Sequence, residues 1–115
     1  MPGLVLTTAA VTALAATCAA GSGVPVERLR AVAIHESGLK PYAIGVNADP
    51  ARGLPAATIS PATPAEAVAQ ATALLAQGRR IDLGLMQISD RQLRGLSIAE
   101  AFDPCLAIWE SNDFA

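Results

Sequence analysis

Aromatic residues and clusters of basic residues are scarce in this chain. Aromatic side chains make up only 3% of its 115 residues, although hydrophobic residues reach 52%. The apolar bulk therefore comes mainly from Ala, Leu and Val, a composition that favours close-packed helices over an aromatic-rich β-sandwich. The formal net charge is -2 and Lys and Arg form no cluster, so the sequence predicts no nucleic-acid partner. The length suffices for one domain with a modest core.

Potential metal ligands are equally scarce. The single histidine, His35, precedes Glu36, but Leu39 stands where the H-E-x-x-H zinc motif needs its second histidine. The two cysteines, Cys18 and Cys105, are too far apart for a C-x-x-C site. We therefore expect no metal and no cofactor. Two interpretations of the cysteines stay open. They form one disulfide closing a loop of about 87 residues, worth roughly 4–5 kcal/mol in an oxidising compartment, or they are inert buried thiols.

The N-terminal stretch is apolar and nearly uncharged. Residues 4–20 lack the Lys/Arg-rich start of a secretory signal, and they are short and rich in Ala and Thr for a membrane span. We interpret residues 1–20 as a packed N-terminal helix, with a degenerate export segment as the alternative. Residues 21–115 form the main body of what we expect to be one domain overall.

Capping signals predict where the helices begin and end. Thr63 and Ser97 each open a capping box, and Gly38 supplies a C-terminal stop. The expected helices cover residues 5–19, 25–37 and 64–77, followed by short helices after residue 97. The sequence thus predicts a mainly α-helical fold with at most one small β-hairpin, between residues 43 and 60. A sheet of four or more strands would contradict this interpretation.

Glu36 stands out on the predicted helix over 25–37. At about 100° per residue it shares one stripe with Val32 and other apolar residues, while His35 points away. A carboxylic acid on a buried stripe is stabilised in its protonated form, which makes it a candidate general acid. Its position fits equally a helix-end Glu that caps the helix or forms a salt bridge.

A second informative segment runs from Gly84 through Met86 and Gln87. A glycine there permits close approach of the backbone to a ligand. The Gln87 amide suits sugar hydroxyls and N-acetyl groups, and Met86 can pack on a sugar face. The simpler account of this segment alone is a buried stretch with one polar residue.

Taken together, the motifs point to a known family. The chain resembles the soluble lytic transglycosylase family of the lysozyme-like superfamily in three ordered stretches: Glu36-Ser37-Gly38, residues 42–47 (YAIGVN) and residues 82–88 (DLGLMQI). The predicted helix over 64–78 and the segment 102–105 are similar to the subfamily attached to type IV secretion and conjugal-transfer systems. That subfamily carries a cysteine before the catalytic helix, and Cys18 matches it. The resemblance covers about residues 12–109.

The resemblance implies a lysozyme-like domain that cleaves the β-1,4 bond between N-acetylmuramic acid and N-acetylglucosamine. In the family one Glu, matched here by Glu36, protonates the leaving oxygen and then acts as base while the muramyl C6 hydroxyl closes a 1,6-anhydro ring. Ser37 would orient this acid or contact the N-acetyl group, and Asn47, Met86 and Gln87 would line the groove. Asp49 and Asp82 are expected in structural or rim roles. The implied partners are peptidoglycan glycan strands in the periplasm and components of a secretion system.

The sequence departs from the family at its end. No Tyr-Asn-containing motif follows Trp109, which indicates a C-terminally truncated copy. Two alternatives to the enzyme therefore stay open: a non-catalytic glycan-binding or assembly module, and a hydrolytic muramidase with a second carboxylate opposite Glu36. A dry pocket around Glu36 would favour the enzyme, and a solvent-open Glu36 would favour the binding module.

Overall fold

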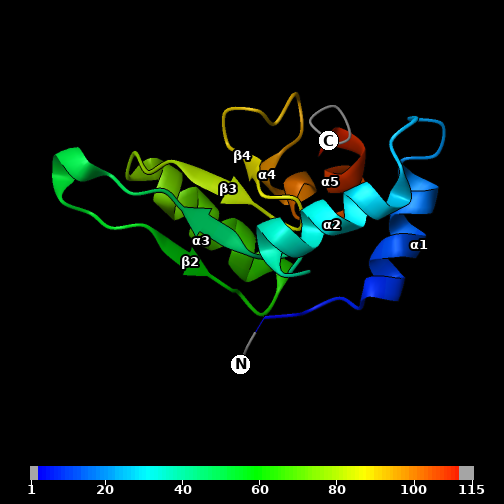
Figure 1. The fold of residues 1–115 in the computed structure, drawn as a ribbon. Coiled ribbons are helices and arrows are strands. Elements are labelled where there is room, and N and C mark those ends of the chain that lie inside the picture. Colours follow the sequence, from blue (N-terminus) through cyan, green and yellow to red (C-terminus); the bar gives the residue numbers. More distant parts are fainter. Residues whose placement is uncertain (1–2, 112–115) are drawn as a thin grey trace.

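The computed structural model describes residues 3–111, which fold around helices with a small sheet (Figure 1). In chain order the elements are α1 (Thr8–Cys18), α2 (Val26–Ser37), β1 (Ile44–Val46), the 3₁₀ helix η1 (Pro50–Arg52), β2 (Ala57–Ile59), α3 (Pro64–Ala76), β3 (Ile81–Leu83), β4 (Ile88–Ser89), α4 (Ile98–Ala101) and α5 (Pro104–Ser111). The mainly α-helical class is confirmed. The expectation about the C-terminal motif falls partly on residues 112–115, outside the described residues.

Local capping explains the helix boundaries. The Thr63 hydroxyl accepts a hydrogen bond from the Glu66 amide at 3.1 Å, so α3 begins where the sequence predicted. Ser97 and Glu100 form a complete capping box at α4. Gly38 ends α2 in the left-handed conformation, with φ of 63°. Because the Thr7 hydroxyl accepts from the Ala10 amide, α1 begins at Thr8, later than the predicted boundary.

The sheet is larger than predicted. Four antiparallel strands lie in the order β2-β1-β3-β4, and Ile44 of the inner strand β1 pairs with Ile59 on one side and Leu83 on the other. The limit of one hairpin between residues 43 and 60 is therefore wrong, although the helical class holds. Each strand has only two or three residues, too few for the alternating pattern that reveals a strand in a sequence.

Two apolar clusters form the core on either side of the segment between β3 and β4. The first packs α1 and α2 against α5; its buried members include Val11, Ala15, Leu29, Ala33, Leu85 and Ile108. The second packs the sheet against α3 and α4; its buried members include Ile44, Ala67, Ile81, Leu83 and Phe102. Leu85 belongs to the first cluster and Leu83 to the second. The two clusters therefore meet at Gly84, which lies between these residues in the chain.

Gly84 begins a tight turn between β3 and β4. Its φ is 79°, and a Cβ built on it would come within 2.5 Å of the Ala101 carbonyl oxygen of α4. Its amide donates to the Ala43 carbonyl at 2.8 Å. The close approach that the sequence indicated is therefore made to a neighbouring helix, because only a glycine leaves room for that carbonyl.

A disulfide joins the first helix to the last. Cys18 at the end of α1 is bonded to Cys105 at the start of α5, with Cα atoms 5.3 Å apart. This separation lies within the expected range of roughly 4.4–6.8 Å. Of the two interpretations of the cysteines, the structure contains the disulfide. Among the described residues, no helix combines the length and apolar character needed to cross a bilayer.

Removing this disulfide should destabilise the protein by about 2–5 kcal/mol, because the unfolded chain gains the entropy of a long open loop. The variant Cys18→Ser with Cys105→Ser should therefore unfold at a lower urea concentration than the oxidised wild type. Dithiothreitol should lower the wild-type midpoint and leave that of the double variant unchanged. Equal midpoints for oxidised wild type and double variant would contradict this assignment.

The substitution Gly84→Ala should destabilise the fold by roughly 2–5 kcal/mol, since it adds backbone strain and a clash with the Ala101 carbonyl. Gly53→Ala is the matched control. Gly53 also has a positive φ, 68°, but a Cβ there would meet nothing within 4 Å. The control should therefore lose only about 1 kcal/mol of stability, from the backbone strain alone. Urea unfolding measures both, and equal losses would exclude the close approach as the cause.

Candidate active site

A cleft of about 310 Å³ lies between the end of α2, the turn after β3 and the end of α5. Its lining residues are Val32, Glu36, Met86, Gln87, Ile88, Ser89, Gln92 and Ser111. Five site residues were predicted apart from the cysteines. Three of them, the acid Glu36 together with Met86 and Gln87, line this cleft. The volume is at the lower end of the range for ligand sites, about 300–1,000 Å³.

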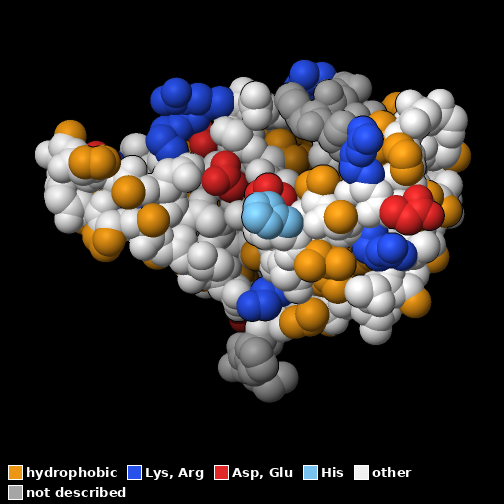
Figure 2. Space-filling view, in the orientation of Figure 1, with side chains coloured by type: hydrophobic (Ala, Val, Ile, Leu, Met, Phe, Trp, Pro, Cys, Tyr) orange, Lys and Arg blue, Asp and Glu red, His pale blue; other side chains and the backbone are white. Residues whose placement is uncertain are grey.

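Glu36 lies in the last turn of α2 and is exposed. The expectation that it would be buried is wrong. The apolar stripe itself is present, since Leu29 and Ala33 are buried in the core and Val32 is partly buried. However, Glu36 extends the stripe past the packed region and into the cleft, where no side chain covers it completely. Figure 2 shows acidic side chains beside the exposed His35 on this face of the molecule.

Met86 and Gln87 form the opposite side of the cleft. Met86 is only 5% exposed and packs into the first apolar cluster, so it presents a fixed thioether surface. Gln87 has a φ of 51°. Its side-chain nitrogen donates to the carbonyl oxygens of Ala43 at 3.1 Å and Gly84 at 3.0 Å. These two hydrogen bonds fix the orientation of the amide and direct its oxygen over β1.

Gly45 of β1 makes room for this amide. A Cβ built on Gly45 would lie 2.5 Å from Gln87 Oε1 and 3.7 Å from the Cβ of Asp82. The Gln87 amide oxygen therefore occupies the space over Gly45, next to the side chain of Asp82. The sequence did not predict that Gly45 belongs to this arrangement.

Ser37 and Asn47 do not line the cleft. The Ser37 hydroxyl donates to the Ala33 carbonyl at 3.0 Å and accepts from the Lys40 amide at 3.3 Å, so it closes the end of α2. Asn47 is exposed at the end of β1, where its side chain hydrogen-bonds Asp82. The substrate-binding roles assigned to both residues from the resemblance stay predictions.

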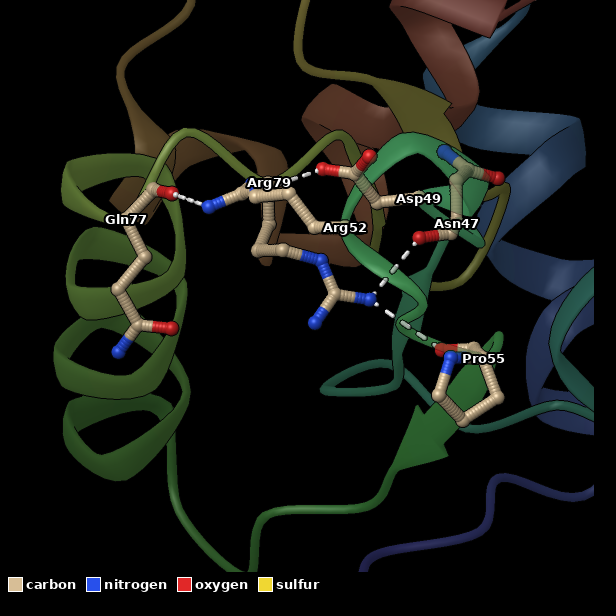
Figure 3. Close-up of polar contacts among 6 residues, drawn as sticks. All are labelled: Asn47, Asp49, Arg52, Pro55, Gln77 and Arg79. Atoms are coloured by element: carbon tan, nitrogen blue, oxygen red, sulfur yellow. Dashed lines mark hydrogen bonds and ion pairs between the residues drawn. The ribbon is translucent and has the colours of Figure 1, made fainter.

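Two arginines hold the loop that contains Asn47 (Figure 3). Arg79 donates to the main-chain oxygens of Asn47 at 3.1 Å and Pro55 at 3.3 Å. Arg52 pairs with Asp49 at 2.6 Å and donates to the Gln77 carbonyl at the end of α3. The Arg52 guanidinium donates a hydrogen bond to the Asp49 carboxylate, which holds the pKa of Asp49 below its ordinary value. These contacts fix the backbone from which Asn47 reaches Asp82.

Asp82 is a partly buried acidic residue of the strand β3. Burial raises its pKa above the ordinary value of 3.8; the hydrogen bond from Asn47 opposes this, and the negative charges of Asp90 and Glu36 add to it. Sequence reasoning gave Asp82 a structural or rim role, and the polar position between Ile81 and Leu83 was the available signal.

The arrangement can perform proton transfer to a bound sugar. An accessible carboxyl group on one wall faces an apolar floor and a fixed amide on the other, which are the elements that hold a pyranose ring beside an acid. Among residues 3–111, no group of three His, Cys, Asp or Glu side chains could hold a metal ion.

Comparison with known proteins identifies the family. The family model described as the transglycosylase SLT domain matches residues 14–110, which include every residue of the cleft except Ser111. No curated protein and no solved structure matches the chain. Because the matched region covers most of the sequence, the chain belongs to the transglycosylase SLT domain family, whose lysozyme-like members are lytic transglycosylases of peptidoglycan.

Proposed function

We propose that this protein is a peptidoglycan lytic transglycosylase with Glu36 as its acid. It cleaves the β-1,4 bond between N-acetylmuramic acid and N-acetylglucosamine and releases a 1,6-anhydro product. The observation that carries the proposal is the position of Glu36 in one cleft with Met86 and Gln87, in a chain of the SLT family.

Glu36 serves both halves of the reaction. Its carboxyl proton goes to the glycosidic oxygen as the bond to the muramyl C1 breaks. The resulting carboxylate then accepts the proton of the muramyl C6 hydroxyl, whose oxygen bonds to C1. Glu36 is exposed, and a glycan strand seated on Met86 displaces water from the cleft and strengthens electrostatic interactions at the acid.

The cleft walls have complementary roles in substrate binding. Met86 provides a buried apolar surface for a sugar face. The Gln87 amide nitrogen is engaged by two backbone carbonyls, so its oxygen is oriented to accept a hydrogen bond from an N-acetyl N–H. Ser89 and Gln92 add polar groups to the same wall. Ser37 and Asn47 act indirectly, through the end of α2 and through Asp82.

We also propose a periplasmic location and a role in opening the cell wall for a type IV secretion or conjugation apparatus. The disulfide between Cys18 and Cys105 supports an oxidising compartment. The resemblance of residues 64–78 and 102–105 to the secretion-associated subfamily supports the partner. Components of that apparatus would then be partners in addition to peptidoglycan glycan strands.

The exposure of Glu36 supports a second candidate, a non-catalytic module that binds glycan strands. An acid in a dry pocket is held ready for proton transfer, whereas an exposed one depends on the substrate to exclude water. Both candidates predict glycan binding, so release of a cleaved product is the property that separates them.

The substitution Glu36→Gln should abolish release of 1,6-anhydro muropeptides, because it keeps the shape of the side chain and removes the proton donor. The loss should be at least on the order of 10²–10⁴ in rate. Glu27→Gln is the matched control, since Glu27 is exposed on the first turn of the same helix. Mass spectrometry of digested peptidoglycan measures the products, and urea unfolding confirms that the variants fold.

The outcomes separate the candidates. Wild type that binds glycan without releasing any product would establish the binding module. Full activity of Glu36→Gln would show that another group is the acid. Products that carry a reducing muramic acid in place of the anhydro ring would identify a hydrolytic muramidase.

A further inference from the structure

We propose that a second pocket, separate from the cleft, binds a single sugar ring of a peptidoglycan strand. The volume of this second pocket is about 230 Å³. Its lining residues are Tyr42, Pro64, Ala99, Phe102, Asp103 and Pro104. None of them lines the cleft around Glu36. The inference rests on the proposed function for the class of ligand, and it adds an anchoring site that the cleavage reaction does not require.

Two segments that carry the family resemblance meet in the second pocket. Tyr42 begins the segment 42–47, and residues 102–104 belong to the segment 102–105. Neither Tyr42 nor any residue of 102–105 lines the cleft. The cleavage reaction therefore gives these residues no role, whereas a ligand in the second pocket would.

Two polar groups of the second pocket have unused hydrogen-bonding capacity. Asp103 Oδ1 accepts from the backbone amides of Cys105 at 2.9 Å and Leu106 at 3.0 Å, at the start of α5. Within residues 3–111, Asp103 Oδ2 and the Tyr42 hydroxyl make no hydrogen bond. The carboxylate oxygen can therefore accept from a ligand hydroxyl, and the Tyr42 hydroxyl can donate or accept.

The walls of the second pocket are apolar and fixed. Phe102 is only 2% exposed and belongs to the second apolar cluster, against which Tyr42 packs. Pro64 and Pro104 are the first residues of α3 and α5, and the proline ring restricts the backbone there. The two hydrogen bonds to Oδ1 hold the Asp103 side chain. A ligand therefore binds without a large cost for ordering these side chains.

The charges around the second pocket favour a neutral ligand that carries hydroxyl groups. Its described lining contains no Lys, Arg or His, so an anion would meet the Asp103 carboxylate without a compensating cation. The attraction of this carboxylate for a cation is offset, because α3 and α5 both begin at the pocket and helix N-termini carry partial positive charge. A pyranose ring suits these surroundings, since its hydroxyls donate to Asp103 while its apolar face packs on Tyr42.

The size and position of the second pocket limit the ligand to one ring and leave the cleft accessible. Its volume lies below the range of about 300–1,000 Å³ that drug-sized ligands occupy. Helix α5 begins at Pro104 in the second pocket and ends at Ser111 in the cleft, a rise of roughly 10 Å. A sugar held in the second pocket therefore leaves the cleft free for the strand that is cleaved.

Titration with N-acetylglucosamine, followed by NMR, tests the second pocket directly. The amide signals of Ala99 and Phe102 should shift, with a dissociation constant on the order of millimolar for one ring. Asp103→Asn should weaken this binding about tenfold or more, because asparagine still caps α5 but presents an amide donor in place of the accepting Oδ2. Glu27→Gln is the matched control. It removes the same charge from an exposed site outside both pockets and should leave the titration unchanged.

Three outcomes of this titration would overturn the inference. The first is a set of shifts confined to cleft residues such as Ser89 and Gln92. The second is equal binding by wild type and Asp103→Asn. The third is tighter binding of Nα-acetyl-lysine amide than of the sugar at the same signals, which would assign the second pocket to a basic side chain of a protein.

Turnover separates the second pocket from the cleft. Tyr42→Phe and Asp103→Asn should keep wild-type kcat on a short soluble glycan, since neither residue lines the cleft, and should bind insoluble peptidoglycan more weakly. Unchanged binding to insoluble peptidoglycan in both variants would contradict the anchoring role. If wild type cleaves no glycan while Ala99 and Phe102 still shift, the proposed cleavage fails and the sugar pocket stands. If wild type cleaves glycan and these signals do not shift, only the sugar pocket fails.

Discussion

The close approach of Gly84 to the Ala101 carbonyl determines where one entire wall of the cleft lies. This contact fixes the turn between β3 and β4 against α4, and the chain then passes from the second apolar cluster into the first. Asp82 lies just before the turn, and Met86 and Gln87 lie within it. A side chain at position 84 would push the turn away from α4, so the position of the cleft wall depends on a glycine at this position.

The position of the opposite cleft wall depends on where α2 extends beyond the packed core. Its apolar stripe is buried at Leu29 and Ala33, but the helix continues to Ser37, beyond the core. Glu36 therefore faces the cleft from the end of a helix whose other turns are fixed. Glu36 is thus anchored in position and yet exposed, and under the proposed function its desolvation depends on the bound glycan.

Polar and covalent contacts hold the two sides of the molecule together. The disulfide ties α1 to α5, and α5 contributes to the cleft through its last turn. On the sheet side, Arg79 fixes the backbone of Asn47, and Asn47 in turn hydrogen-bonds Asp82. Each side is thus held in place by contacts remote from the cleft, so that binding energy is not spent on ordering it.

The sequence by itself determined what depends on near neighbours. The helix ends at Gly38, Thr63 and Ser97 are local hydrogen-bonding events and were predicted well, and the ordered motifs identified the family. Tertiary structure decided what depends on distant partners. The short strands form only because β1 pairs on both sides, and the exposure of Glu36 reflects the limit of the core, which no periodicity within one helix encodes. The proximity of Asp82 to Gly45 and Ser89 likewise arises from strand pairing across the fold.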